Sequence, residues 1–378
     1  MPNNAIPNPV ARSGYSRALS PEKRKRIDRL YEHYIGFSRD RLLRDALRAL
    51  VDTLPEETPA GVQHGHMPAV EACSPSNLLA FDEEVDEDVP DKRRILALCG
   101  ESDAGKTRAL LEHYRRTPEM QPFTGPDRIR RNPTLWIKAP SPSTPQRLAF
   151  SALQGLGVPV RVNLAENRIW EFLRDELKAH RTRFFVIDEA QDAIETANKI
   201  EKIKIANALR NLVQMEDCPV RLILLGVPPL TEFLERKQLF NRRNVIAFER
   251  LTFDNEVPTV RIVLRTIICD HATMTFDLID SDDFARKLSH ACAGQIGSVV
   301  KFVRASVERA IREDREVVTL ADFAAVYAGV AGCRADENVF TVDRWQNLDP
   351  VTALRREGDR EYIATRAANA ASRKARRA

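Results

Sequence analysis

The sequence lacks any apolar run long enough to cross a membrane. No stretch of its 378 residues approaches the ~20 consecutive apolar residues that a spanning helix needs. Residues 1–19 are polar and proline-rich and lack the apolar core of a signal peptide. We therefore expect a cytoplasmic protein with no membrane partner and a disordered amino terminus.

Cysteine is sparse and charge is nearly balanced. The six cysteines are scattered, mostly within apolar stretches, and contain no C-x-x-C pair, so we expect reduced, buried thiols. The formal net charge of +4 is too small to diagnose a partner. What the chain does contain is 43% hydrophobic residues, enough for one large α/β domain and one or two smaller pieces.

A phosphate-binding loop organises the sequence. Residues 100–107 read Gly-Glu-Ser-Asp-Ala-Gly-Lys-Thr, between an apolar run and a helical pattern. This is G-x-x-x-x-G-K-[ST] in the strand–loop–helix context that distinguishes it from a chance match. The glycines let backbone N–H groups turn towards phosphates, and the helix that follows adds the positive end of its dipole. Lys106 would contact the phosphates, and the Thr107 hydroxyl would ligate Mg²⁺. The loop predicts binding of ATP with Mg²⁺, but it does not indicate what the protein uses the nucleotide for.

Two carboxylates follow a second apolar run. Residues 184–187 read Phe-Phe-Val-Ile and lead into Asp188 and Glu189. Ligands of parallel sheets collect at the carboxyl ends of the strands. We predict that Asp188 holds Mg²⁺ opposite Thr107 and that Glu189 polarises the attacking water. The alternative is that the aspartate only caps the next helix.

The pattern around these motifs predicts an α/β fold with a central parallel sheet. From residue 93, apolar strands near 134–138, 183–188, 220–226 and 244–248 alternate with helical stretches near 106–116, 145–156, 166–180, 198–215 and 229–237. A proline- and arginine-rich loop spans 122–133. Two helices broken near Gly36 precede the sheet, and helical segments near 254–271, 280–292, 297–313 and 319–330 follow it.

These patterns divide the chain into five predicted regions. They are a disordered start (1–19), a helical extension with an acidic linker (20–92), the nucleotide-binding core (93–253), a helical lid (254–330) and an irregular basic tail (331–378). The basic face of the first helix, rich in Lys and Arg over 23–29, is either solvated or a contact for nucleic acid or protein. The tail is likewise either solvated or suited to DNA. His64 and His66 have no evident further metal ligands and fit surface residues better than a metal site.

Four motifs together resemble the AAA+ ATPase family. They are the loop 100–107, the segment 186–191, the segment 224–228 and the segment 238–243. Within that family the chain looks most like TniB, TnsC and MuB, the ATP-dependent regulators of DDE transposases, over roughly residues 20–345. The first helix also fits the TniB pattern. The first two motifs are specific for a P-loop ATPase, whereas the assignment to the transposition branch rests on overall likeness.

The resemblance implies an oligomer, a ring or a helical filament on DNA, with ATP between neighbouring subunits. Arg242 matches the family's arginine finger and Arg243 is its alternate, so these two join Lys106 and Glu189 as catalytic residues. The implied nucleotide-binding residues are Gly100, Glu101, Ser102, Asp103, Ala104, Gly105, Lys106, Thr107, Arg108 and Asp188.

Two departures from the family pattern indicate a slow, ATP-timed switch. The usually polar sensor position holds Gly226 and Val227, and Ser298 stands where many AAA+ proteins place an arginine. A slow switch suits a regulator better than a motor. Residues near the loops that face the family's pore are candidates for DNA contact, and the alternative is that they cap helices or pair with acidic side chains: Lys138, Thr144, Arg147, Arg128, Arg130 and Arg131.

The resemblance implies a bacterial regulator that oligomerises on double-stranded DNA without sequence preference. It would recruit a transposase and a target-selection protein of the TniQ type, and hydrolysis would disassemble it. The alternative is a AAA+ switch in signalling or secretion that acts on proteins and ignores DNA. A nucleotide-stabilised scaffold that scarcely hydrolyses ATP is a third reading, and a metabolic kinase fits least.

Overall fold

The computed structural model describes residues 19–54, 94–125, 127–141, 143–160, 164–195, 197–215 and 218–350. The described residues within Met1–Gly36, Ser102–Gly105 and Glu249–Ala378 form one compact unit, and those within Phe37–Glu101 and Lys106–Phe248 form a second. The predictions for the amino terminus, for the acidic linker with His64 and His66, and for the tail beyond residue 350 lie outside the described residues.

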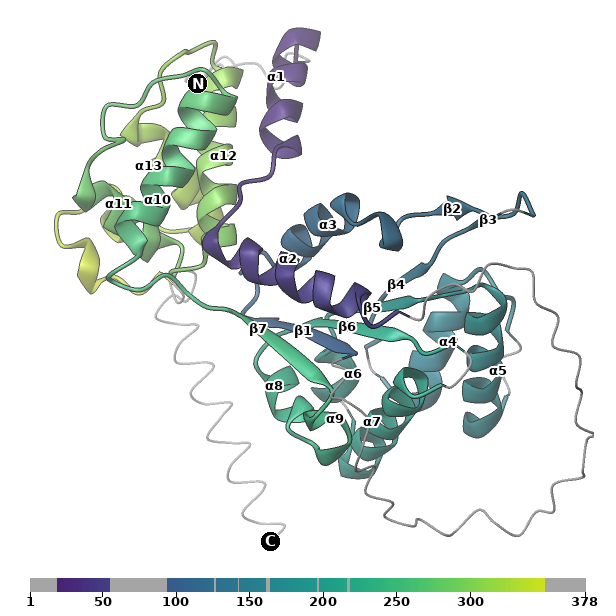
Figure 1. Ribbon diagram of the computed structural model, residues 1–378. Coiled ribbons are helices and arrows are strands. Elements are labelled where there is room, and N and C mark those ends of the chain that lie inside the picture. The colour runs from purple at the N-terminus through teal and green to yellow at the C-terminus, as the bar shows by residue number, and fades with distance from the viewer. Residues whose placement is uncertain are drawn as a thin grey trace, which may run out of the picture. The chain divides into compact units, whose positions relative to one another are not determined.

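The second unit is built on a five-stranded parallel sheet. Its order is β4-β5-β6-β1-β7, so the first strand lies between the last two (Figure 1). Strands β1, β5 and β6 are almost entirely buried, as near-continuous apolar runs in a sheet covered on both faces should be. The predicted parallel α/β sheet is confirmed, with strands β1 Ile95–Gly100, β4 Thr134–Lys138, β5 Phe184–Asp188, β6 Arg221–Gly226 and β7 Arg243–Phe248.

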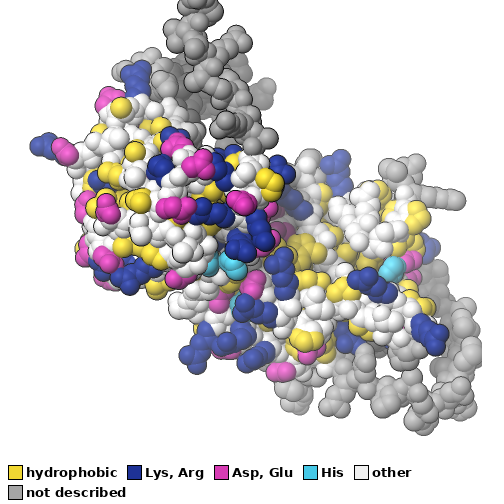
Figure 2. Space-filling view, turned by 90° about the horizontal axis from the view of Figure 1, so that it is seen from above, with side chains coloured by type: hydrophobic (Ala, Val, Ile, Leu, Met, Phe, Trp, Pro, Cys, Tyr) yellow, Lys and Arg dark blue, Asp and Glu magenta, His cyan; other side chains and the backbone are white. Residues whose placement is uncertain are grey.

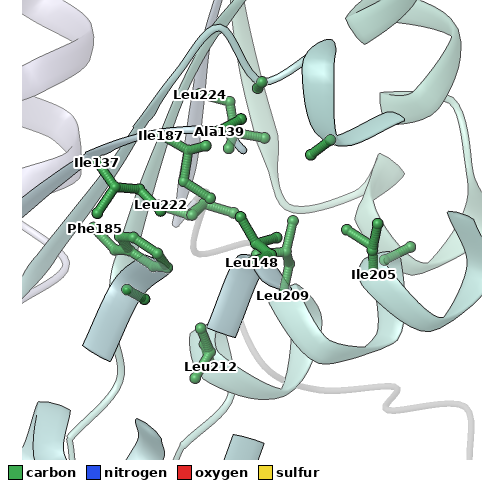
Figure 3. Packing of buried hydrophobic residues seen from close by; sticks show 14 of the residues in the cluster. Ile137, Ala139, Leu148, Phe185, Ile187, Ile205, Leu209, Leu212, Leu222 and Leu224 are labelled. Carbon is green, nitrogen blue, oxygen red and sulfur yellow. The ribbon is translucent and has the colours of Figure 1, made fainter. Parts of the chain in front are cut away.

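Helices cover both faces of this sheet. Helix α2 (Ser38–Val51) and helix α3 (Lys106–Arg116) contact β1 on one face. Helices α4 (Pro145–Gly155), α5 (Glu166–Ala179) and α7 (Lys199–Val213) cover the other. On that second face, alternate strand residues such as Ile187 and Leu222 pack against Leu148 and Leu209 of the helices (Figure 3). The resulting core holds the carboxyl ends of the strands in place.

Two local predictions differ from the structure. The single helix expected over 229–237 is two short helices, α8 (Pro229–Leu234) and α9 (Lys237–Phe240), and the short helix α6 (Asp192–Glu195) precedes them in the chain. The loop predicted over 122–133 contains a small antiparallel hairpin of β2 (Phe123–Thr124) and β3 (Arg130–Arg131). Strands of two residues are too short to leave a periodic pattern in the sequence.

Helices make up most of the described part of the first unit. Its core is a group of aromatic rings, in which Phe284 and Phe323 lie 4.9 Å apart, centroid to centroid. The predicted helical segments are confirmed as α10 Glu256–Leu264, a π-helical turn Arg265–His271, α11 Asp282–Ala291, α12 Ile296–Arg312 and α13 Leu320–Ala331. Two 3-10 turns, Ala335–Glu337 and Trp345–Asn347, lie in the stretch expected to be irregular.

The predicted helix at the start of the chain, α1 (Pro21–Glu32), packs against α12 of this same unit. It buries Ile27 and Leu30. Two of its basic side chains are ion-paired within the unit, Lys23 with Asp314 at 2.7 Å and Arg26 with Glu316 at 2.9 Å. Part of the basic face of α1 is therefore neutralised by acidic side chains of the same unit.

The described residues were compared with the requirements of a membrane-spanning helix, a metal site and a disulfide. None of their helices combines the length and apolarity needed to span a bilayer. They contain no group of three or more His, Cys, Asp or Glu side chains able to hold a metal ion. None of the five described cysteines forms a disulfide, and Cys99 and Cys292 are buried while Cys269 is exposed.

Candidate nucleotide-binding site

The phosphate loop joins β1 to α3, and its glycines are required by its geometry. A Cβ added to Gly100 would lie 2.4 Å from the carbonyl oxygen of Phe248 on β7, too close for any side chain. Gly105 has a φ of 89° and Asp103 a φ of 61°, so the loop turns through the left-handed region twice. Such turns direct successive N–H groups towards one point, where an anion can bind.

Lys106 lies inside the loop. Its side chain is only 9% exposed, and its Nζ donates hydrogen bonds to the carbonyl oxygens of Gly100 at 2.7 Å and Glu101 at 2.8 Å. A buried ammonium needs such partners, because burial without them would be costly. The positive charge is thus held where the loop would receive phosphate oxygens.

Thr107 and Asp188 meet at the carboxyl edge of the sheet. Thr107 Oγ1 donates to Asp188 Oδ2 at 3.1 Å, although the two residues lie on α3 and β5. Burial raises the pKa of Asp188, while the hydrogen bond from Thr107 acts in the opposite direction. A hydroxyl and a carboxylate are the oxygen donors that Mg²⁺ prefers, so this pair fits the ion. Bound there with ATP, Mg²⁺ would neutralise charge on the phosphates.

Glu189 follows directly, in an unusual backbone conformation. Its φ is 52°, in the left-handed region, which costs a residue with a side chain on the order of 1 kcal/mol. Its backbone N–H donates to Asp188 Oδ1 at 2.9 Å. The chain therefore turns sharply at the end of β5, as catalytic turns often do. The structure brings Lys106, Thr107, Asp188 and Glu189 to the carboxyl edge of one sheet.

Gln191 is a site residue to which the sequence analysis gave no role. Its side chain is 7% exposed, and its Nε2 donates to Glu189 Oε2 at 2.6 Å and to Asp192 Oδ1 at 3.3 Å. Its Oε1 accepts a hydrogen bond from the Val227 N–H at 3.2 Å. The available signal was an amide two positions after the acidic pair.

The predicted arginine pair lies at the other end of the sheet. The Ile95 N–H at the start of β1 donates to the Arg242 carbonyl oxygen at 2.9 Å, and Arg243 is paired in register with Ile95. Gly100 is paired with Phe248, five residues further along both strands. At about 3.3 Å per residue, Arg243 lies roughly 16 Å from the level of the phosphate loop. The structure does not bring the arginines and the phosphate loop of one chain together.

The remaining nucleotide-binding candidates belong to the loop or the first turn of α3. Ser102 and Asp103 are exposed, Ala104 is buried, and Glu101 and Arg108 are half-buried. The sensor position, Gly226 with Val227, presents no polar side chain, but the Val227 N–H is engaged by Gln191.

The candidate DNA contacts fall into two places. Lys138 ends β4 and is exposed, while the Thr144 hydroxyl accepts from the Arg147 N–H at 3.2 Å and so caps α4. In the β2–β3 hairpin, Arg131 Nη1 donates to Asp127 Oδ1 at 2.7 Å, whereas Arg128 and Arg130 are exposed. On the face seen in Figure 2, Lys and Arg side chains lie interspersed with Asp and Glu.

Comparisons with known structures found limited similarity. Cdc6p from Pyrobaculum aerophilum has a TM-score of 0.45 and 15% identity over 64% of this chain and 65% of that one. The Aeropyrum pernix ORC2 protein has a TM-score of 0.41 and 14% identity over 64% and 66%. The Walker-type ATPase paby2304 of Pyrococcus abyssi has a TM-score of 0.39 and 12% identity over 63% and 67%. The first two alignments span slightly less than two thirds of those chains, and scores this low support no transfer of function. No curated protein matches the sequence.

A family model described as an AAA domain matches residues 89–234. The match includes the phosphate loop, Asp188, Glu189 and Gln191, and it ends before Arg242. The matched residues contain the phosphate loop and the acidic pair, and the structure joins these two motifs through the hydrogen bond from Thr107 to Asp188. Residues 89–234 are thus an AAA domain, a P-loop ATPase domain.

Proposed function

We propose that this ATPase acts as a slow, ATP-timed assembly switch. It binds ATP with Mg²⁺, oligomerises with ATP between neighbouring subunits, and hydrolysis dissolves the assembly. The observation that supports this is the separation of about 16 Å, along β1 and β7, between Arg243 and the phosphate loop. An arginine side chain cannot span that distance within its own chain, but it could reach the nucleotide of a neighbour and stabilise the transition-state charge.

In this proposal the assembly forms on double-stranded DNA and marks it as a target for transposition. It recruits a DDE transposase and a target-selection protein of the TniQ type, as the resemblance to TniB, TnsC and MuB implies. The exposed side chains of Lys138, Arg128 and Arg130 support DNA binding, because basic residues contact the phosphate backbone. Contacts of this kind give little sequence preference and a strong dependence on salt.

The test is DNA binding with and without ATP·Mg²⁺ at two salt concentrations. We expect light scattering and electron micrographs to show assemblies that need both ATP and duplex DNA and that weaken at the higher salt concentration. Lys106→Ala is the control, and we expect it to abolish assembly because the loop then lacks its phosphate-binding charge.

The opposite outcome would favour the alternative, a AAA+ switch that acts on a protein partner. In that case ATP·Mg²⁺ would produce no assembly on DNA, the ATPase rate would be unchanged by DNA, and no salt-sensitive DNA binding would be measured. The ATPase assignment of residues 89–234 would stand in either case.

A further inference from the structure

The orientation of the Gln191 amide is determined by its surroundings. Its Nε2 lies 2.6 Å from Glu189 Oε2, a carboxylate oxygen that can only accept while the group is ionised. Its Oε1 lies 3.2 Å from the backbone nitrogen of Val227, which can only donate. Exchanging the oxygen and nitrogen would place two acceptors together and two donors together. One amide orientation therefore satisfies both neighbours.

The amide has little freedom to leave this position. Gln191 is 7% exposed, and a buried amide that loses its hydrogen bonds costs about 1–3 kcal/mol. The turn that carries it is also joined to β6 through the backbone, since the Ala190 N–H donates to the Leu225 carbonyl oxygen at 2.7 Å. Two hydrogen bonds thus hold this turn against the end of β6, one between backbone groups and one from the Val227 N–H to the Gln191 side chain.

Gly226 explains how the amide fits. A Cβ at this position would lie 2.9 Å from Gln191 Oε1 and 3.0 Å from Leu230 Cδ2. The missing side chain at the sensor position is therefore what leaves space for Gln191. The absence of a side chain at Gly226 and the burial of Gln191 therefore depend on each other.

We propose that Gln191 is a positioning residue for ATP hydrolysis, tying the Glu189 carboxylate to the end of β6 in place of a polar side chain at position 226 or 227. The proposal rests on the catalytic role proposed for Glu189. The bond uses Oε2, and no hydrogen bond to Oε1 forms among the described residues, so in this proposal Oε1 accepts a hydrogen bond from the attacking water. Gln191 joins the Glu189 carboxylate to Val227 at the end of β6. The position of that carboxylate therefore depends on β6.

The test separates kcat from ATP binding. Gln191→Leu keeps approximately the same volume and removes both hydrogen bonds. We expect kcat to fall about 10- to 100-fold, because a displacement of ~1 Å can cost 10²-fold in rate. We expect KM and the affinity for ATP·Mg²⁺ to stay within about twofold, since the phosphate loop is untouched. Gly226→Ala, which keeps Gln191 but pushes on its Oε1, should lower kcat in the same way and serves if Gln191→Leu does not fold.

Gln146→Leu is the matched control. This half-buried glutamine of the same unit donates from Nε2 to the Leu164 carbonyl oxygen at 2.6 Å rather than to a carboxylate, and its loss should leave kcat unchanged. A double-mutant cycle adds a second readout: in the Glu189→Gln background, Gln191→Leu should cause almost no further loss of rate, because both changes act through one carboxylate.

Two results would overturn the proposal. One is a wild-type kcat in Gln191→Leu. The other is a parallel fall of kcat, ATP affinity and melting temperature, repeated in the Glu189→Gln background, which would mean that the amide only stabilises the fold. Wild-type hydrolysis by Glu189→Gln itself would instead remove the catalytic role of Glu189. All these assays compare the basal ATPase rates of the variants without DNA, so the comparison holds whether or not the protein assembles on DNA.

Discussion

At the scale of single residues, Glu189 combines a left-handed φ of 52° with a carboxylate that accepts a hydrogen bond from Gln191 at 2.6 Å. Both features limit where the carboxylate can lie. Lys106 donates hydrogen bonds to the carbonyl oxygens of Gly100 and Glu101, and Thr107 donates to Asp188. The proposed function therefore assigns nucleotide binding and activation of water to different side chains of one site.

Glu189→Gln should separate these two tasks. We expect ATP·Mg²⁺ affinity within about twofold of the wild type, because the phosphate loop and Asp188 are unchanged, and hydrolysis lowered by about 10²–10⁴-fold, the usual contribution of a general base. Steady-state phosphate release and equilibrium titration with ATP measure the two quantities. If the protein assembles as proposed, the variant should form assemblies that persist with ATP. Unchanged phosphate release would contradict the assignment and support the nucleotide-stabilised scaffold instead.

Gly100→Ala tests the close approach of β1 and β7. The added Cβ would lie 2.4 Å from the Phe248 carbonyl oxygen and 2.6 Å from Phe248 Cβ, and relief would require moving one paired strand. We expect a loss of about 1–3 kcal/mol in the free energy of unfolding, measured by chemical denaturation. Gly329→Ala is the control: nothing lies within 4 Å of its added Cβ, and in helix α13 alanine should stabilise by about 0.5–1 kcal/mol.

At the scale of elements, α13 depends on one buried carboxylate. Asp322 accepts from the Thr319 N–H at 2.9 Å, which caps the helix, and from Arg315 Nη1 at 2.9 Å. Its side chain is 2% exposed. Burial acts to raise the pKa of Asp322, but the hydrogen bonds from Arg315 and Thr319 outweigh burial and hold the pKa below its ordinary value of 3.8.

Asp322→Asn should therefore destabilise the first unit and change its response to acid. We expect a loss of about 2–3 kcal/mol near neutral pH, less than for a fully buried pair because Arg315 is partly exposed. A lowered pKa means that the unfolded chain binds the proton more readily, so the contribution of Asp322 is present above pH 3.8 and is lost as the pH falls through its folded-state pKa.

Thermal unfolding from about pH 6 down to about pH 3 measures both effects. The melting temperature of the wild type should fall more steeply below about pH 4 than that of the variant. Asp314→Asn removes an ion pair with Lys23 whose aspartate is 77% exposed, and it should change stability by less than about 1 kcal/mol. Equal effects of the two substitutions would show that burial of Asp322 contributes nothing.

At the scale of the whole molecule, the proposed arginine finger and the phosphate loop lie at opposite ends of the β1–β7 strand pair. In one chain the carboxyl end of β1 carries the phosphate loop, and the amino end of β7 carries Arg242 and Arg243. Arg242 is the residue proposed to reach a neighbouring subunit and Arg243 is its alternate, with the Arg243 guanidinium 4.5 Å from the Phe240 ring centroid.

Mixing two inactive variants tests this division. We expect Arg242→Ala to lower assembly-dependent hydrolysis by about 10³-fold, and Lys106→Ala to abolish it. An equimolar mixture should regain measurable activity, because some interfaces then combine the intact loop of one variant with the intact arginine of the other. Arg243→Ala is the comparison and should have the smaller effect. Failure of every mixture to recover activity would argue for a site complete within one chain.

Much of the fold could be predicted from the sequence, and so could the phosphate loop and the acidic pair, but not the role of Gln191. The strands appear as apolar runs and the helices as periodic patterns, because burial on a parallel sheet or a helix face leaves a local signature. The hairpin over 123–131 could not be predicted, since its turn depends on a hydrogen bond from the Ile129 N–H to Asp127 Oδ1 rather than on periodicity.

The amino-acid sequence alone determined the phosphate loop, the acidic pair and the parallel sheet, because each depends on residue types at short, fixed spacing. Only the tertiary structure decided that Gln191 bonds both Glu189 and the end of β6, and that Arg242 lies a strand's length from Gly100. The physical reason is the strand order, in which β1 lies between β6 and β7, partners that follow it by more than 100 residues. Contacts between segments so far apart are set by packing of the whole sheet, and no local pattern encodes them.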